Sequence, residues 1–286
     1  MANRILILGA SGMLGSTLFR YLSAQDHCEV VGTLRSNICS DYYNSKEKLQ
    51  LITGVDVENL DILEKLFLEF RPDVVINCVG LVKQLDIAND PLIVLPINSI
   101  LPHRLAKFAK LIEARLIHIS TDCVFSGDRG GYEENDFADA RDLYGRSKFI
   151  GEVAYAHTIT LRTSIIGHEI NKKIALINWF LSQKGPIFGY KNAIFSGLPT
   201  VEVASIILNY VLPKPNLSGV YHLASSPINK YDLLKLVASE YKKDIQIIPD
   251  DTVKINRSLN AEKFNSQTGY KPPSWPILIK KMHEFG

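Results

Sequence analysis

The sequence predicts an α/β fold in which helices cover both faces of a parallel sheet. Three observations support this class. Short apolar segments without polar alternation recur along the N-terminal half, helical patterns separate them, and a glycine-rich turn joins the first strand to the first helix. Continuous apolar strands are typical of parallel sheets buried on both faces, and their alternation with helices is typical of doubly wound folds.

The expected elements alternate as far as residue 163. We predict strands at residues 4–8, 29–34, 51–55, 73–79, 115–120 and 158–163. We predict helices at residues 12–24, 60–70, 101–113 and 143–155. Pro102 fits the first turn of its helix, where a missing amide hydrogen is tolerated. These elements predict a Rossmann-type sheet, which binds ligands beyond the carboxyl ends of its strands.

The alternation breaks down after Gly167. We predict helices at residues 201–212 and 231–241, short strands at residues 220–223 and 245–248, and prolines between several of them. Residues 1–166 are therefore expected to form a dinucleotide-binding domain that includes the helix of residues 143–155. We expect residues 167–286 to form mainly a smaller α/β substrate-binding cap, with some segments returning to the first domain.

Composition excludes several other classes of protein. Of the 286 residues, 46% are hydrophobic and 22% are charged, as in an ordinary soluble globular protein. A net charge of +2 gives no basic field for nucleic acid, and no apolar run approaches the roughly 20 residues that span a membrane. Four scattered cysteines and the absence of a signal-peptide layout indicate a cytoplasmic protein with reduced thiols and no metal site. We expect a monomer or homodimer.

A glycine-rich loop follows the first predicted strand. Its candidate cofactor-binding residues are Gly9, Ser11, Gly12, Met13, Leu14 and Gly15. Glycines in such a turn let the backbone approach a pyrophosphate and let the helix pack closely on the strand, and the helix N-terminus attracts phosphate. A plain strand–helix turn would also use glycine, but the position between a strand and a helix favours a dinucleotide site.

The end of the second strand indicates which dinucleotide is bound. An acidic side chain there would bind the ribose 2′-hydroxyl of NAD, whereas this chain has Arg35 and Ser36. A guanidinium and a hydroxyl suit a 2′-phosphate, so we expect NADPH, with NADH possible and a solvated surface arginine as the alternative. The other expected cofactor contacts are Asp56 and Val57 at the adenine, and Cys78, Val79, Gly80 and Asn98 near the nicotinamide ribose.

The segment of residues 116–152 carries the predicted chemistry. Ser120 and Thr121 end a strand, and Tyr144 and Lys148 lie one turn apart on one face of the next helix. The Lys148 ammonium should lower the pKa of Tyr144, which then protonates a carbonyl oxygen as hydride reaches the carbon. Thr121, with Ser120 close by, should bind that oxygen, and Lys148 should hold the nicotinamide ribose. An exposed amphipathic helix face is the alternative reading of Tyr144 and Lys148.

These motifs together resemble the extended short-chain dehydrogenase/reductase superfamily and, within it, the dTDP-4-dehydrorhamnose reductase family. The resemblance covers nearly the whole chain. The matching residues are 9–15, 120–122, 124–125, 144–148, 151–152, 161–164, 167 and 197–200. The resemblance implies an oxidoreductase that uses NADPH to reduce the C4 keto group of a nucleotide-linked 4-keto-6-deoxyhexose, in bacterial surface-polysaccharide and O-antigen precursor synthesis.

Four features near the expected sugar pocket depart from the usual pattern of that family: Cys123, Ser126, residues 82–85 and residues 195–198. With these departures, the chain resembles a branch thought to reduce UDP-2-acetamido-2,6-dideoxy-4-ketohexoses to UDP-N-acetyl-L-rhamnosamine. The resemblance thus leaves both UDP-linked and dTDP-linked sugars open. It implies Arg257, and next Lys83 and Lys230, as partners of the diphosphate. The other candidate substrate-binding residues are Gln84, Asp122, Cys123, Ser164, Asn178, Trp179 and Gly197.

Two other functions remain open. The first is a nucleotide-sugar epimerase or dehydratase with a retained cofactor. Dehydratases that resemble this fold need an Asp-Glu pair after the strand-end threonine, whereas Asp122 is followed by Cys123. The second is a non-catalytic NADP-binding regulatory subunit, because the methionine adenosyltransferase beta subunit resembles the same family.

Overall fold

A seven-stranded parallel sheet forms the centre of the computed structural model, which describes residues 3–83, 89–170 and 174–286. The strand order is β11-β6-β5-β4-β1-β2-β3, and every neighbouring pair is parallel. The strands are β1 (Asn3–Leu8), β2 (Cys28–Leu34), β3 (Leu51–Thr53), β4 (Val74–Asn77), β5 (Arg115–Thr121), β6 (Thr158–Thr163) and β11 (Gly219–His222). The predicted Rossmann-type fold is confirmed.

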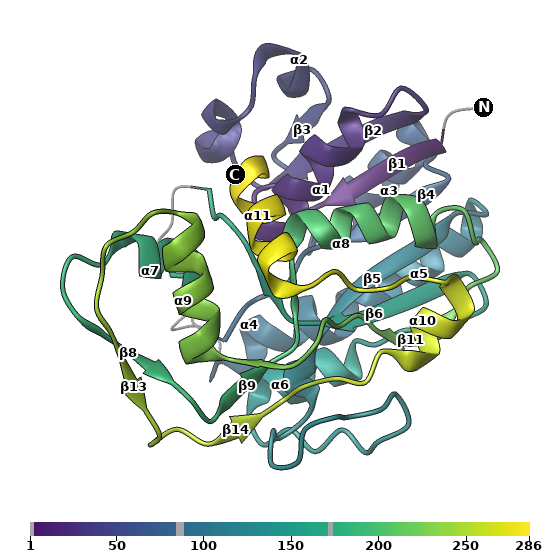
Figure 1. The fold of residues 1–286 in the computed structure, drawn as a ribbon. Coiled ribbons are helices and arrows are strands. Elements are labelled where there is room, and N and C mark those ends of the chain that lie inside the picture. Colours follow the sequence, from purple (N-terminus) through teal and green to yellow (C-terminus); the bar gives the residue numbers. More distant parts are fainter. Residues whose placement is uncertain (1–2, 84–88, 171–173) are drawn as a thin grey trace.

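Helices cover both faces of this sheet (Figure 1). The helices of the N-terminal half are α1 (Met13–Ser23), α2 (Ser45–Lys48), α3 (Leu60–Phe70), α4 (Pro91–Leu95), α5 (Leu101–Leu111) and α6 (Leu143–Ile150). Those of the C-terminal half are α7 (Leu176–Ser182), α8 (Thr200–Ile206), α9 (Lys230–Glu240), α10 (Glu262–Thr268) and α11 (Trp275–Phe285). Short 3-10 turns lie at η1 (Asn37–Tyr42) and η4 (Asp122–Val124), and π-turns at η3 (Pro96–Ile100) and η5 (Ile207–Val211).

Strand β1 explains why the sheet is buried on both faces. Its residues alternate between two separate cores, because successive side chains of a strand point to opposite faces. Ile5 and Ile7 belong to the core formed with α1, α8 and α11, whereas Leu6 and Leu8 belong to the core formed with α3 and α5. All four side chains are completely buried. Residues 5–8, which are buried on both faces of the sheet, are therefore all apolar.

Three small sheets lie beside the large one. Strand β8 (Ile187–Tyr190) pairs with β13 (Ile247–Asp250), and β7 (Ile165–Ile166) pairs with β10 (Leu198–Pro199). Strand β9 (Ala193–Phe195) pairs with both β12 (Ile228–Asn229) and β14 (Ile255–Asn256). Strand β11 returns to the edge of the large sheet, and α8 and α11 pack on its face. The division of the chain at residue 166 stays a prediction.

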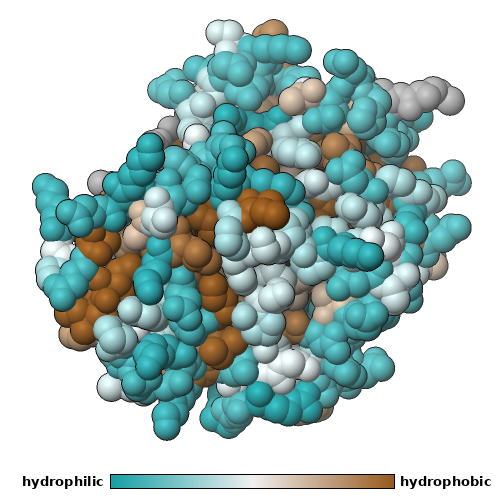
Figure 2. Space-filling view, in the orientation of Figure 1, coloured by the Kyte–Doolittle hydropathy of each residue, from teal (hydrophilic) through white to brown (hydrophobic). Residues whose placement is uncertain are grey.

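The surface is unevenly polar. Figure 2 shows apolar side chains gathered on the side of the molecule where α9, β8 and β13 lie, whereas most of the rest of the visible surface is hydrophilic. Phe188 of β8 is 60% exposed there. No helix within the described ranges combines the length and apolarity needed to cross a membrane.

Candidate active site

The glycine loop has the geometry that a bound pyrophosphate requires. Gly9 adopts a φ of +86°, and a side chain on Gly15 would lie 2.1 Å from the Gly9 carbonyl oxygen. Gly12 is exposed and precedes α1, whose N-terminus has no side-chain cap and no acidic residue in its first turn. The unpaired amide groups and the helix dipole therefore face a bare, glycine-lined turn. These residues fit the phosphates of a dinucleotide.

The residues predicted to contact the adenosine half follow adjacent strands. Leu34 of β2 pairs in register with Thr53 of β3, and the Val55 amide donates to the Leu34 carbonyl at 3.1 Å. The chain segments that carry Arg35 and Asp56 therefore leave the same edge of the sheet side by side. Arg35, Ser36 and Asp56 are exposed, and the partly buried Val57 packs on the core beneath. The predicted contacts of these four residues with the cofactor stay predictions. The exposed side chains of Arg35, Ser36 and Asp56 are accessible to a ligand.

The end of β4 brings several predicted residues together. A side chain added to Gly80 would lie 3.5 Å from Asn98 Oδ1 and 3.8 Å from Lys148 Nζ. The Asn98 side chain is buried, accepts from the Leu81 amide at 2.9 Å and donates to the Leu81 carbonyl at 3.1 Å. Asn98 therefore holds the loop that follows Gly80, and a direct contact with a cofactor stays a prediction. Burial raises the pKa of Cys78 to about 12, so this thiol is neutral.

Tyr144 and Thr121 meet at the end of β5, as predicted. Asp142 caps α6 by accepting from the Gly145 amide at 2.8 Å, which fixes the turn that carries Tyr144. The Thr121 side chain lies close enough to Tyr144 to lower its pKa, and its hydroxyl donates to Asp122 Oδ1 at 3.2 Å. The Thr121 oxygen accepts from the Cys123 amide at 3.1 Å. Two hydroxyls therefore converge where a carbonyl oxygen could be bound and protonated.

The expected effect of Lys148 on Tyr144 is wrong. Burial raises the pKa of Tyr144 above its ordinary value, and the neighbouring Cys123, Asp122 and Asp142 raise it further. The Lys148 ammonium instead donates to the Ile119 carbonyl at 2.7 Å, and burial lowers its own pKa to about 8. Loss of hydration is the largest cause of the Tyr144 shift, and Tyr144 stays protonated at neutral pH.

The expected contact of Ser120 with the substrate oxygen is also wrong. Alternation along β5 directs Ser120 and Thr121 to opposite faces of the sheet. The Ser120 hydroxyl donates to Glu152 Oε1 at 2.7 Å. Ser120 therefore anchors the strand end from behind, and Thr121 alone of this pair faces Tyr144.

A charged cluster lies beside the tyrosine. Burial raises the pKa of Asp122, whereas Arg257 and Lys230 act to lower it, which places both cations near this carboxyl group. Arg257 Nε donates to the Phe125 carbonyl at 2.9 Å, and the Lys230 ammonium lies 4.4 Å from the Phe195 ring centre. Burial and the Asp122 charge raise the pKa of Cys123 to about 12, so Cys123 is not a reactive thiolate.

The remaining predicted substrate residues differ in their surroundings. Lys83 forms an ion pair with Asp142 at 2.6 Å, which ties it to the N-terminus of α6, and Gln84 lies outside the described residues. A side chain on Gly197 would lie 2.0 Å from the Ser164 carbonyl oxygen, so these two backbones are in close contact. Asn178 accepts from the Glu169 amide at 3.1 Å, while Trp179 is 37% exposed. The substrate-binding roles of Asn178 and Trp179 stay predictions.

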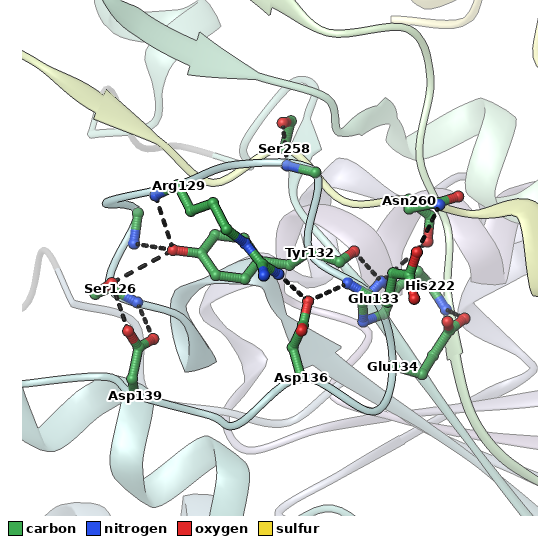
Figure 3. A network of polar contacts seen from close by, with 12 residues as sticks. Ser126, Arg129, Tyr132, Glu133, Glu134, Asp136, Asp139, His222, Ser258 and Asn260 are labelled. Carbon is green, nitrogen blue, oxygen red and sulfur yellow. Dashed lines mark hydrogen bonds and ion pairs between the residues drawn. The ribbon is translucent and has the colours of Figure 1, made fainter.

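A loop that the sequence analysis passed over supports this cluster. Figure 3 shows the Tyr132 hydroxyl accepting from the backbone amides of Gly127 and Arg129, each at 3.2 Å. The Tyr132 amide donates to the Ser258 carbonyl at 2.9 Å, which joins this loop to the segment that carries Arg257. Tyr132 also stacks on Phe125 with 4.3 Å between ring centres. No local signal in the sequence indicates contacts between segments so far apart.

Comparison with known proteins identifies related chains. The family model described as "RmlD substrate binding domain" matches residues 3–284. dTDP-4-dehydrorhamnose reductase of Escherichia coli is 25% identical over 97% of this chain and 96% of the relative, and methionine adenosyltransferase 2 subunit beta of Mus musculus is 26% identical over 98% and 90%. A dTDP-4-dehydrorhamnose reductase from Bacillus anthracis, solved in complex with NADP, has a TM-score of 0.81, 21% identity and coverage of 100% and 99%. The similarity to the Bacillus anthracis structure is evidence for the fold alone.

Proposed function

The chain belongs to the RmlD substrate-binding domain family, and from this premise we propose that it is an NADPH-dependent nucleotide-sugar reductase. Its substrate would be a nucleotide-linked 4-keto-6-deoxyhexose, reduced at the C4 keto group. The observation that carries the proposal is the convergence of Thr121, Tyr144 and Lys148 next to the glycine loop and the end of β4. The curated relatives named dTDP-4-dehydrorhamnose reductase support the same reaction class.

The residues at the strand ends fit an NADPH molecule. The glycine loop and the uncapped α1 would hold the pyrophosphate, and Arg35 with Ser36 would bind the 2′-phosphate. Lys148 would bind the nicotinamide ribose, close to Gly80. When bound, the reduced nicotinamide supplies the hydride that reaches C4 of the sugar.

The proton comes from the protein. Tyr144 is protonated at neutral pH, as an ordinary tyrosine would be, and its raised pKa keeps it so. Its hydroxyl can therefore donate a proton to the C4 oxygen as that oxygen gains negative charge. When substrate binds, the Thr121 hydroxyl would donate its single hydrogen to the same oxygen in place of Asp122 Oδ1. The carbonyl thus gains one hydride and one proton and becomes an alcohol, and Tyr144 is left as tyrosinate beside the Lys148 ammonium.

The substrate diphosphate would bind to the cations near Asp122. Arg257 and Lys230 reach this region from the C-terminal half of the chain, and both lie close enough to Asp122 to act on the pKa of its carboxyl group. Guanidinium and ammonium groups are the usual protein partners of phosphate oxygens. We extend the proposal to a UDP-2-acetamido-2,6-dideoxy-4-ketohexose as substrate, with dTDP-4-dehydrorhamnose as the other candidate. The loop that carries Lys83, which pairs with Asp142 at the start of α6, would supply polar partners for an N-acetyl group at C2.

One specific observation favours a second candidate function. Several curated relatives are named methionine adenosyltransferase 2 subunit beta, and their identity to this chain equals that of the reductases. A non-catalytic, NADP-binding regulatory subunit would fit those relatives. The dehydratase alternative is weaker, because Cys123 stands where that reaction needs a second carboxyl group.

The test measures NADPH oxidation with a panel of UDP- and dTDP-linked 4-keto-6-deoxy sugars. The proposal expects turnover of at least one of them and a loss of turnover of at least 100-fold, roughly the contribution of a general acid, in Tyr144→Phe. No turnover across the panel, or full activity of Tyr144→Phe, would refute it. Arg35→Ala should reduce the preference for NADPH over NADH, with Arg104→Ala as a control on α5.

A further inference from the structure

A buried ion pair lies directly behind the catalytic strand end. Glu152 follows α6 and Arg162 lies in β6, and their side chains are only 5% and 4% exposed. Arg162 Nε donates to Glu152 Oε1 and Arg162 Nη2 donates to Oε2, both at 2.7 Å. Glu152 Oε1 also accepts from the Ser120 hydroxyl at 2.7 Å. The carboxylate therefore joins the catalytic helix to β5 and β6 in a fixed geometry.

The outer end of this pair is held by a neutral histidine. Burial and the Arg162 charge lower the pKa of His222 to about 3, so its ring is uncharged at neutral pH. Arg162 Nη1 lies 3.3 Å from His222 Nε2, and a guanidinium can only donate, so Nε2 accepts. Nδ1 then carries the proton and donates to the carbonyl oxygens of Tyr132 and Asn260, each at 3.1 Å. Arg162 is thereby oriented toward Glu152.

The end of β5 connects this pair to Lys148, because the Lys148 ammonium donates to the Ile119 carbonyl and the next residue, Ser120, donates to Glu152, both at 2.7 Å. This lysine is 5% exposed, so burial lowers its pKa to about 8, and Glu152 and Cys78 oppose that effect. The groups facing it are Cys78 from β4, His118 from β5 and Glu152 after α6, while η3 contains no titratable side chain. Burial raises the pKa of the Cys78 thiol to about 12 and lowers that of His118, so both are neutral. Glu152 is the charged member of this set, and its partner Arg162 from β6 is the opposite charge that lies beyond it.

We propose that Glu152 is a positioning residue that keeps Lys148 in its ammonium form and fixes the strand end carrying Thr121. Its link to catalysis rests on the function proposed above, whereas its effect on the charge of Lys148 is a property of the unliganded protein. The ammonium is the form that can bind ribose hydroxyls and stabilise the tyrosinate left by proton donation. In this proposal Glu152 contacts neither the ribose nor Tyr144. It acts through Lys148 and Ser120.

The decisive experiment titrates Lys148 in the unliganded protein. Lysine ¹³C resonances are followed by NMR from pH 6 to 11, and the Lys148 signal is identified by its absence in Lys148→Met. Glu152→Gln should lower the Lys148 midpoint by about one pH unit, as expected for loss of a nearby opposite charge. Glu152→Asp, which keeps the charge, should stay closer to the wild-type midpoint.

Two further variants test whether the change in the Lys148 midpoint is specific to Glu152. Glu202 is a matched control, because its side chain is 4% exposed and pairs with Lys281 at 2.7 Å on another part of the fold. Glu202→Gln should leave the Lys148 midpoint unchanged. Cys78→Ala removes the other group that raises the pKa of Lys148, and its midpoint should fall by less than that of Glu152→Gln, so this variant still tests the proposal if Glu152→Gln does not fold. An unchanged midpoint in Glu152→Gln, or a drop of about one unit in Cys78→Ala, overturns the proposal.

If the proposed reductase activity is found, a second measurement applies. The alkaline limb of kcat/KM against pH should move to lower pH in Glu152→Gln, so that the activity deficit is several-fold larger at pH 8 than at pH 6. A purely structural role would lower the rate by the same factor at each pH. Failure to find any turnover would refute the proposed function without affecting the NMR result.

Discussion

Replacing Gly15 by alanine gives the sharpest test of the glycine loop. An added side-chain carbon would lie 2.1 Å from the Gly9 carbonyl oxygen, 2.8 Å from the Gly9 carbonyl carbon and 3.2 Å from the Ala10 Cα atom. All three are backbone atoms, and no flexible side chain can move aside. The loop itself must therefore shift away from α1.

The magnitude follows from two opposing effects. Forcing an extra carbon into a packed region costs about 1–3 kcal/mol, and an overlap this deep lies at the upper end. Alanine regains about 1 kcal/mol through its better helix propensity. We expect Gly15→Ala to lower the free energy of unfolding by about 1–2 kcal/mol, and to weaken NADPH binding because the displaced loop no longer presents its amide groups.

Gly12→Ala is the matched control. Its added carbon would meet only the Gly9 carbonyl oxygen, at an ordinary 3.5 Å, and its φ of −82° suits any residue. Its free energy of unfolding should change by less than about 1 kcal/mol. Urea unfolding without cofactor and fluorescence titration with NADPH measure the two effects. A Gly15→Ala protein as stable as the Gly12→Ala protein would refute the reasoning.

Three other predictions address the charged groups. Arg162→Met should cost about 3–5 kcal/mol in urea unfolding, because it leaves the Glu152 carboxylate buried without its partner; a loss as small as that of a surface ion pair would contradict this. Between pH 8 and 10.5 the unfolded chain holds a proton on Lys148 that the folded chain loses, so the free energy of unfolding should rise with pH relative to Lys148→Met. A flat difference across that range would count against the lowered pKa. Arg257→Ala should raise the KM for the nucleotide sugar by roughly tenfold or more and leave the dissociation constant of NADPH unchanged, and equal effects on both would remove Arg257 from the diphosphate site.

Local patterns in the sequence were sufficient for the large sheet. Several strands of the first 163 residues contain consecutive apolar residues, as at residues 5–8 and 74–76, and burial on both faces of the sheet makes such runs favourable. The ends of some elements were less predictable. The helix that begins at Leu143 stops at Ile150, five residues before its expected end. A side chain at Gly151 would lie 2.0 Å from the Asn98 carbonyl oxygen, and such a contact with η3 has no local signature.

By itself, the sequence determined the glycine loop, the Thr121, Tyr144 and Lys148 set, and the edge of the sheet where they meet. These depend on spacing within a strand, a turn or a helix, which nearby residues control. Only the tertiary structure decided the pKa values and the charge pairing of the site residues. Burial reversed the expected change in the pKa of Tyr144, and folding brought Arg162 against Glu152 and Arg257 against Phe125. Hydration and long-range contacts depend on what surrounds a side chain in space, and spacing along the chain does not contain that information.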